Sequence, residues 1–150
     1  MSTGAPFALS DAELASRASA LAPGLLAGRC VIVSGGGSGI GRATAWLAAR
    51  LGARVVICGR NPEKLERVRA ALSERGFPCD ALTLDIRERA AVEAFFDRVP
   101  VGEAGGDLLV NCAGGQFPQA ALDFTEKGWR AVIDTSGWVR RWLGPGATSE

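Results

Sequence analysis

A glycine-rich stretch at residues 34–41 carries the clearest chemical signal in the sequence, because its composition suits the binding of a phosphate. It follows the short apolar run 30–33, which is typical of a buried strand, and it opens a segment with helical spacing. Glycines let the backbone approach a ligand closely, and the first turn of a helix offers unpaired N–H groups. The stretch has the pattern G-x-x-x-G-x-G at Gly35, Gly39 and Gly41. It does not match the G-x-G-x-x-G fingerprint, because Ile40 stands where the last glycine of that fingerprint would fall. An ordinary turn between a strand and a helix remains the alternative interpretation.

A second signal lies at the end of the next apolar run, residues 54–58. In dinucleotide-binding folds, an acidic residue about 20 positions beyond the glycine loop binds the ribose 2′-hydroxyl and selects NAD. Here Gly59 and Arg60 occupy that place. Glycine leaves room for a 2′-phosphate, and the arginine fork can pair with a phosphate through two hydrogen bonds. The pattern predicts NADP(H); the alternative is that Arg60 is only an exposed loop residue.

The elements that must position these residues alternate between strands and helices. Further strands are predicted at about residues 79–84 and 107–111, and helices at about 61–76 and 87–99. A capping box at Ser10 and Glu13 predicts a short helix to about Leu21, and Thr125 is expected to cap the last helix. The order predicts an α/β fold with a parallel sheet. The expected buried helix faces are Ile40, Ala43, Leu47 and Leu51; Leu65, Val68 and Leu72; Val92, Phe95, Phe96 and Val99; and Trp129, Val132 and Ile133.

The composition narrows the classes of function. A net charge of +1 gives no electrostatic reason to expect a nucleic acid or an anionic membrane as partner, and no apolar stretch is long enough to span a bilayer. The four cysteines have no zinc-site spacing and no histidine is present, so we expect no metal site. The thiols are expected to be buried in a reducing compartment, which favours a cytoplasmic location.

The glycine stretch, together with Asp85 and the segment 111–114, resembles the short-chain dehydrogenase/reductase family over about residues 25–135. The family motif is Thr-Gly-x-x-x-Gly-Ile-Gly, and Ser34 replaces its threonine. The resemblance implies a Rossmann-type doubly wound parallel sheet, truncated to about four strands in the order 3-2-1-4. A helix N-cap is the competing role for Asp85. The cofactor-binding residues implied are Gly35, Ser38, Gly39, Ile40, Gly41, Arg60, Asp85, Ile86, Asn111, Ala113 and Gly114.

The segment from Asn111 to Phe117, followed by Gly128 and Trp129, resembles one branch of the family more specifically. That branch reduces trans-2-enoyl-CoA and 2,4-dienoyl-CoA thioesters with NADPH. Bacterial members that oxidise terpenoid alcohols are similar too, so a small carbonyl or alcohol substrate stays open. The resemblance implies an oxidoreductase that acts on a small molecule.

The resemblance covers only the N-terminal part of the family pattern. The family's catalytic Ser and Tyr-x-x-x-Lys have no counterpart, and the chain contains no tyrosine. We therefore expect no catalytic residue here and three regions: an extension at 1–28, a dinucleotide-binding half at 29–135, and a tail unlike the family at 136–150. A truncated or frameshifted product is the hypothesis for this pattern. The alternative function is a catalytically dead nucleotide-binding or interaction module, which self-associates through the exposed fourth strand.

Overall fold

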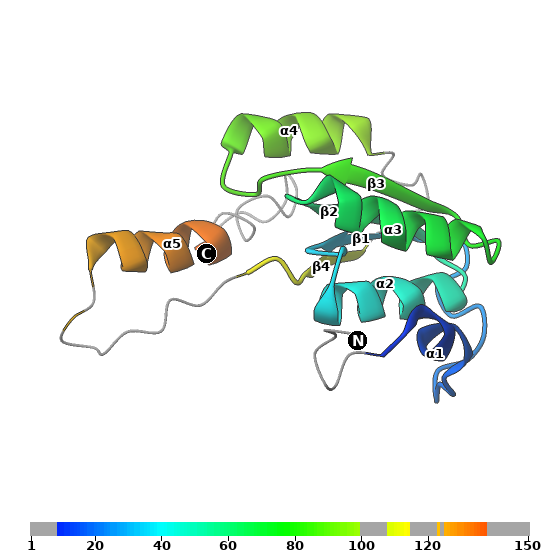
Figure 1. Cartoon of the computed structure of the whole chain (residues 1–150). Coiled ribbons are helices and arrows are strands. Elements are labelled where there is room, and N and C mark those ends of the chain that lie inside the picture. The colour runs from blue at the N-terminus through cyan, green and yellow to red at the C-terminus, as the bar shows by residue number, and fades with distance from the viewer. Residues whose placement is uncertain (1–8, 100–107, 115–122, 124, 138–150) are drawn as a thin grey trace, which may run out of the picture.

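The computed structural model describes residues 9–99, 108–114, 123 and 125–137, with the side chains of 131 and 133–137 left aside. Helices and strands alternate along the chain after a short first helix (Figure 1). This order confirms the predicted α/β class. The elements are α1 (Asp11–Ser16), β1 (Cys30–Ser34), α2 (Gly39–Arg50), β2 (Arg54–Gly59), α3 (Pro62–Ser73), β3 (Cys79–Thr83), α4 (Arg89–Arg98), β4 (Leu108–Asn111) and α5 (Glu126–Gly137).

The four strands form one parallel sheet in the order β3-β2-β1-β4, which confirms the predicted topology. Val33 of β1 is in register with Ile57 of β2 on one side and with Val110 of β4 on the other. The two central strands consist mainly of β-branched residues that are buried on both faces, as expected of strands covered by helices on both sides. Parallel pairing brings the carboxyl ends of all four strands to one edge of the sheet.

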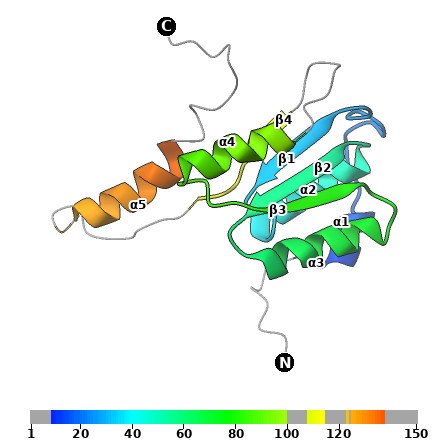
Figure 2. The same ribbon diagram turned by 90° about the horizontal axis from the view of Figure 1, so that it is seen from above.

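Helices cover the two faces of the sheet (Figures 1 and 2). On one face, α2 and α3 enclose a core that includes Trp46 and Leu72, both with no exposed surface. On the other face, α4 places Val92 and Phe95 in a second core against β1 and β2. The inward residues predicted for α3 and α4 are buried, except that Phe96 is only half-buried.

The buried face of α2 differs from the prediction. Ile40 is 80% exposed and Leu47 is 37% exposed, whereas Ala45 and Trp46 are fully buried. Most buried residues of this helix are small, with Gly41 and Ala49 among them, and Trp46 is the one large side chain that it buries in this core. Of the four predicted residues, Leu51 is buried and Ala43 packs against the core, whereas the predicted burial of Ile40 and Leu47 is wrong. Small residues supply most of the buried face, so hydrophobic spacing alone predicted it only in part.

The first helix begins at the predicted capping box, in which Ser10 and Glu13 exchange hydrogen bonds. It ends at Ser16, not near Leu21, because Arg17 already has an extended backbone. The helix packs against α2, where the indole Nε1 of Trp46 donates to Asp11 at 2.8 Å.

The last helix lies beyond the end of β4 and apart from the four strands in both views (Figures 1 and 2). Its N-terminus is capped as predicted, since the Thr125 hydroxyl accepts from the N–H of Gly128 at 3.2 Å. Trp129 is 59% exposed, so its predicted inward placement is wrong for this structure, while Val132 is half-buried. Among the described helices, none is long and apolar enough to cross a membrane.

Candidate cofactor-binding site

A cleft of about 420 Å³ lies at the carboxyl ends of the strands. The segments that follow all four strands line it, namely residues 35–41, 59–65, 84–87 and 112–114. The strand order reverses between β1 and β4, and doubly wound sheets bind ligands at this kind of switch point. The cleft is therefore the position in which the fold itself favours a bound nucleotide.

The glycines after β1 are required by close packing of the backbone. A Cβ added at Gly41 would lie 2.2 Å from the carbonyl oxygen of Gly35, and one at Gly36 would lie 2.6 Å from Cβ of Ile57. Gly35 has a φ of +74° and an added Cβ there would meet the N atom of Ala113 at 2.6 Å. The amide of Gly35 donates to the Cys58 carbonyl at 2.7 Å, which fixes the turn to the end of β2. No larger residue fits at these three positions as the turn is built.

The start of α2 faces the cleft with unpaired amides. The Ser38 side chain makes no cap hydrogen bond, and the first hydrogen bond of the helix runs from the Arg42 N–H to the Ser38 carbonyl. Within the described residues, the N–H groups of Gly39, Ile40 and Gly41 have no hydrogen-bond acceptor. A helix of this length carries a partial positive charge at its N-terminus, so this turn suits an anion such as a pyrophosphate.

The second rim of the cleft is built by the turn from β2 into α3. Gly59 ends the strand, and Arg60 is exposed and lines the cleft. The side chain of Asn61 then caps α3 by accepting from the N–H of Lys64 at 2.9 Å, with Pro62 in the first turn. This rigid start of a helix fixes the position from which the neighbouring cationic side chains extend.

The third rim carries a carboxylate held by an arginine. The Asp85 side chain accepts hydrogen bonds from Nε of Arg87 at 2.9 Å and from Nη2 at 2.5 Å. This hydrogen bonding holds the pKa of Asp85 at about 2, and the charge of Arg60 also lowers it. The N-cap of α4 is Glu88, so the competing interpretation of Asp85 as the helix cap is wrong. Asp85 is instead ionised and fixed at the cleft.

Of the residues predicted from the sequence, most meet in this cleft. Asn111 does not line it; its side chain accepts from the Ser34 hydroxyl at 3.4 Å, beside the smaller apolar cavity under α4. Sequence reasoning missed Lys64 and Arg87 as lining residues; their one signal was the position a few residues after a strand end. The predicted residues that line the cleft are Gly35, Ser38, Gly39, Ile40, Gly41, Arg60, Asp85, Ile86, Ala113 and Gly114.

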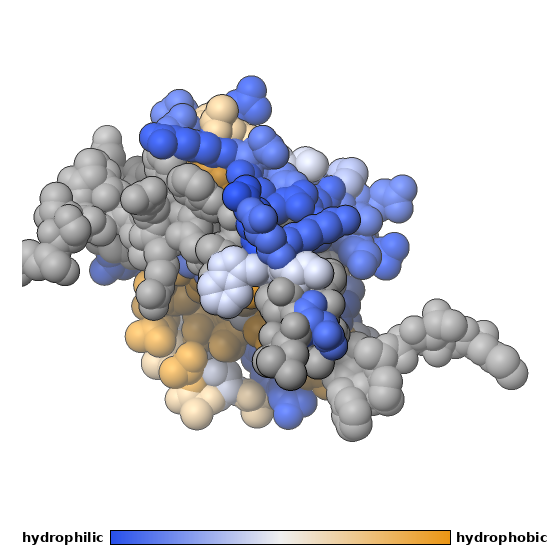
Figure 3. Space-filling view, turned by 90° about the vertical axis from the view of Figure 1, so that its left-hand side faces the viewer, coloured by the Kyte–Doolittle hydropathy of each residue, from blue (hydrophilic) through white to orange (hydrophobic). Residues whose placement is uncertain are grey.

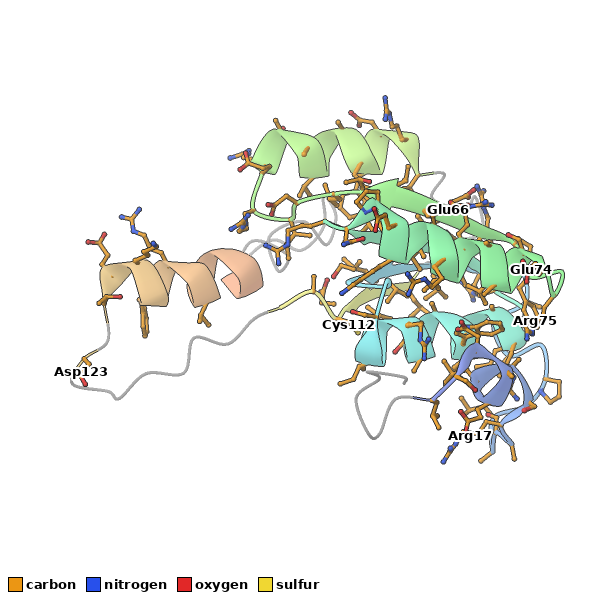
Figure 4. All side chains as sticks on the ribbon, viewed as in Figure 1. Arg17, Glu66, Glu74, Arg75, Cys112 and Asp123 are labelled. Atoms are coloured by element: carbon orange, nitrogen blue, oxygen red, sulfur yellow. The ribbon has the colours of Figure 1, made fainter. Side chains whose placement is uncertain are left out.

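One cysteine also belongs to the cleft. Cys112 follows β4 and lies beside the start of α2 (Figure 4). A Cβ added at Gly41 would be 3.2 Å from the Cβ atom of Cys112. The other three cysteines are buried, and burial raises the pKa of Cys58 and that of Cys79 to about 12. Those two thiols are therefore unsuited to chemistry, as predicted for core cysteines.

Comparisons with known proteins agree with this arrangement. The sequence profile of the short chain dehydrogenase family matches residues 29–137. A probable 2,4-dienoyl-CoA reductase of Caenorhabditis elegans is 35% identical over 117 residues, which are 76% of this chain and 38% of the relative. Among solved structures, the citronellol catabolism dehydrogenase AtuB of Pseudomonas aeruginosa PAO1 has a TM-score of 0.69 at 40% identity, covering 78% of this chain and 48% of that one.

A third similar protein is a 3-oxoacyl (acyl-carrier-protein) reductase of Agrobacterium tumefaciens C58, whose crystal structure has NADP bound. Its TM-score is 0.65 at 27% identity, covering 75% of this chain and 43% of that one. The chain thus belongs to the short-chain dehydrogenase family, whose members are oxidoreductases that bind nicotinamide cofactors. It spans about two fifths of the length of the curated relatives that it matches.

Proposed function

We propose that this chain is the NADP(H)-binding part of a short-chain oxidoreductase that acts on an enoyl-CoA thioester or a small carbonyl or alcohol compound. The observation that carries the cofactor proposal is the turn after β2, where Gly59 and the exposed Arg60 line the cleft in the place of an acidic residue. A glycine there leaves space, and a guanidinium beside it favours a phosphate on the ribose 2′-oxygen.

The charges around the cleft support the same cofactor. Three of the lining residues are basic, Arg60, Lys64 and Arg87, and one is acidic, Asp85. Arg87 is engaged with Asp85, so that this carboxylate does not repel an incoming phosphate as a free one would. The excess of positive charge complements the dianionic 2′-phosphate of NADP(H), which NAD(H) lacks.

The substrate proposal rests on the similarity of the chain to a dienoyl-CoA reductase and to a citronellol dehydrogenase. The second candidate is a nucleotide-binding module without catalysis, and the absence of tyrosine and histidine from the 150 residues favours it. Oxidation of NADPH by the purified chain with crotonyl-CoA would refute the second candidate, since a module without catalysis consumes neither compound.

The cofactor proposal is tested by replacing Arg60 with alanine and measuring the affinities for NADPH and NADH by fluorescence titration. A hydrogen-bonded pair with a charged group is worth about 1.5–3 kcal/mol, so R60A is expected to weaken NADPH binding by roughly 10- to 150-fold. NADH binding should stay unchanged. Arg67 is an exposed arginine of α3 that does not line the cleft, so R67A is the matched control. Equal losses for the two cofactors in R60A would overturn the proposal.

A further inference from the structure

Lys64 lies at the same rim of the cleft as Arg60, on the first turn of α3. This turn is in direct contact with the glycine turn after β1, because a Cβ added at Gly37 would lie 3.2 Å from Cβ of Lys64. The Cβ atom of Lys64 therefore lies next to the glycine turn. From there its flexible four-carbon stem can carry the ammonium group into the cleft.

The backbone of Lys64 is held in place on both sides. Its N–H donates to the Asn61 side chain at 2.9 Å, and the next residue, Leu65, is 2% exposed and packs under the same rim. An added Cβ at Gly59 would lie 3.8 Å from Cδ2 of Leu65, so the helix start and the strand end are packed together. This anchoring keeps the lysine and Arg60 on one rim.

The other groups in the cleft leave Lys64 unpaired. Arg87 is paired with Asp85 at 2.5 Å, whereas no carboxylate of the described residues forms an ion pair with Lys64 or Arg60. A phosphate dianion bound at Arg60 carries a second negative charge, and an ammonium group is a suitable second partner for it.

We propose that Lys64 is the second cation of the 2′-phosphate subsite and that it shares with Arg60 the preference for NADP(H). This inference rests on the proposed function and deepens it. Lys64 determines specificity and does not take part in hydride transfer. It holds the 2′-phosphate from the side of α3, while the guanidinium holds it from the end of β2.

The chain has only two lysines, Lys64 and Lys127, and this permits a direct test. The purified chain is acylated with a limiting amine-reactive ester, and the modification of each lysine is measured by peptide mass spectrometry. Adenosine 2′,5′-bisphosphate and 5′-AMP are compared at equal occupancy, because they differ only in the 2′-phosphate. The bisphosphate should slow the acylation of Lys64 by about fivefold or more, and 5′-AMP should not. Lys127, exposed on α5, is the internal reference.

Variants give the second arm of the test. K64A should weaken NADPH binding by about 3- to 10-fold, less than R60A because an exposed ammonium makes weaker pairs, and should leave NADH binding unchanged. K64R should retain most of the affinity, and K127A should retain all of it.

The outcomes separate this inference from the proposed function. If R60A loses NADPH selectively while K64A and the acylation rate of Lys64 show no effect, the role of Lys64 is refuted and the NADP(H) proposal stands. If neither variant discriminates between the two cofactors, both are refuted. Protection of Lys64 by 5′-AMP as strong as by the bisphosphate also refutes the inference, since the lysine would then sense occupancy alone.

Discussion

Replacing Gly41 with alanine should disrupt the cofactor cleft from within. The added Cβ would lie 2.2 Å from the Gly35 carbonyl oxygen and 2.8 Å from its carbonyl carbon, so the backbone would have to move by about 1 Å. Overpacking of this kind costs about 1–3 kcal/mol, and the displaced turn would also lose its 2.7 Å hydrogen bond to Cys58, which is worth about 1 kcal/mol. We expect G41A to lower the free energy of unfolding by about 2–4 kcal/mol.

The measurement is urea unfolding followed by circular dichroism, in which this loss corresponds to a fall in the midpoint of about 1–2 M. Gly114 provides the matched control. It lines the same cleft, but an added Cβ there meets no atom of the described residues within 4 Å and its φ is not positive. G114A should therefore leave stability unchanged or raise it by about 0.4–1 kcal/mol. A G41A midpoint equal to that of G114A would refute the packing described for the turn.

Three further predictions concern the chain as a whole. At pH 8 Ellman's reagent should react rapidly with one thiol, the half-buried Cys112. Cys30 is only 6% exposed, and with a pKa of about 12 only roughly one in 10⁴ of the Cys58 and Cys79 thiols is ionised. C112S should abolish the fast phase, and a fast phase that persists would contradict this. Light scattering should show that the chain associates at micromolar concentration, because β4 pairs only with β1 within the described residues and Leu108 on it is 45% exposed. Hydrophobic residues also gather on the lower part of the face shown in Figure 3. A monomer with a cooperative melt would refute this prediction. The 150-residue chain should not oxidise NADPH with enoyl-CoA thioesters, ketones or aldehydes, because its sequence has no tyrosine or histidine to act as general acid. A general acid typically raises the reaction rate by about 10²- to 10⁴-fold. Turnover within about tenfold of an intact relative would overturn this prediction.

The central strands β1 and β2 were predictable because each is a short apolar run rich in β-branched residues. β3 and β4 have one β-branched residue each, and the strand order was predicted from right-handed crossovers together with the family resemblance. β1 and β2, which pair in register, together bury eight hydrophobic residues. The alternation of strands with helices then leaves few possible topologies. The buried face of α2 was not predictable from hydrophobicity. Ile40 is exposed because the first turn of this helix borders the cleft. Most of the residues that α2 buries are glycine or alanine.

The site was predictable where one local motif carries it and not where separate segments meet. The glycine turn and Arg60 are visible in the sequence because each follows a strand at a fixed distance. Lys64 and Arg87 belong to different helix starts and loops, and only the packing of α3 against Gly37 and the pairing with Asp85 place them at the cleft. Apart from their position a few residues after a strand end, tertiary contacts of this kind leave no motif in the sequence.

The central claim is that this cleft selects NADP(H) through the positive rim after β2. The most direct measurement is the pair of dissociation constants of the unaltered chain for NADPH and NADH, determined by fluorescence titration in one buffer of fixed ionic strength. We predict that NADPH binds at least about tenfold more tightly than NADH, because only NADPH has a 2′-phosphate that can pair with Arg60. Equal affinities, or tighter binding of NADH, would contradict it.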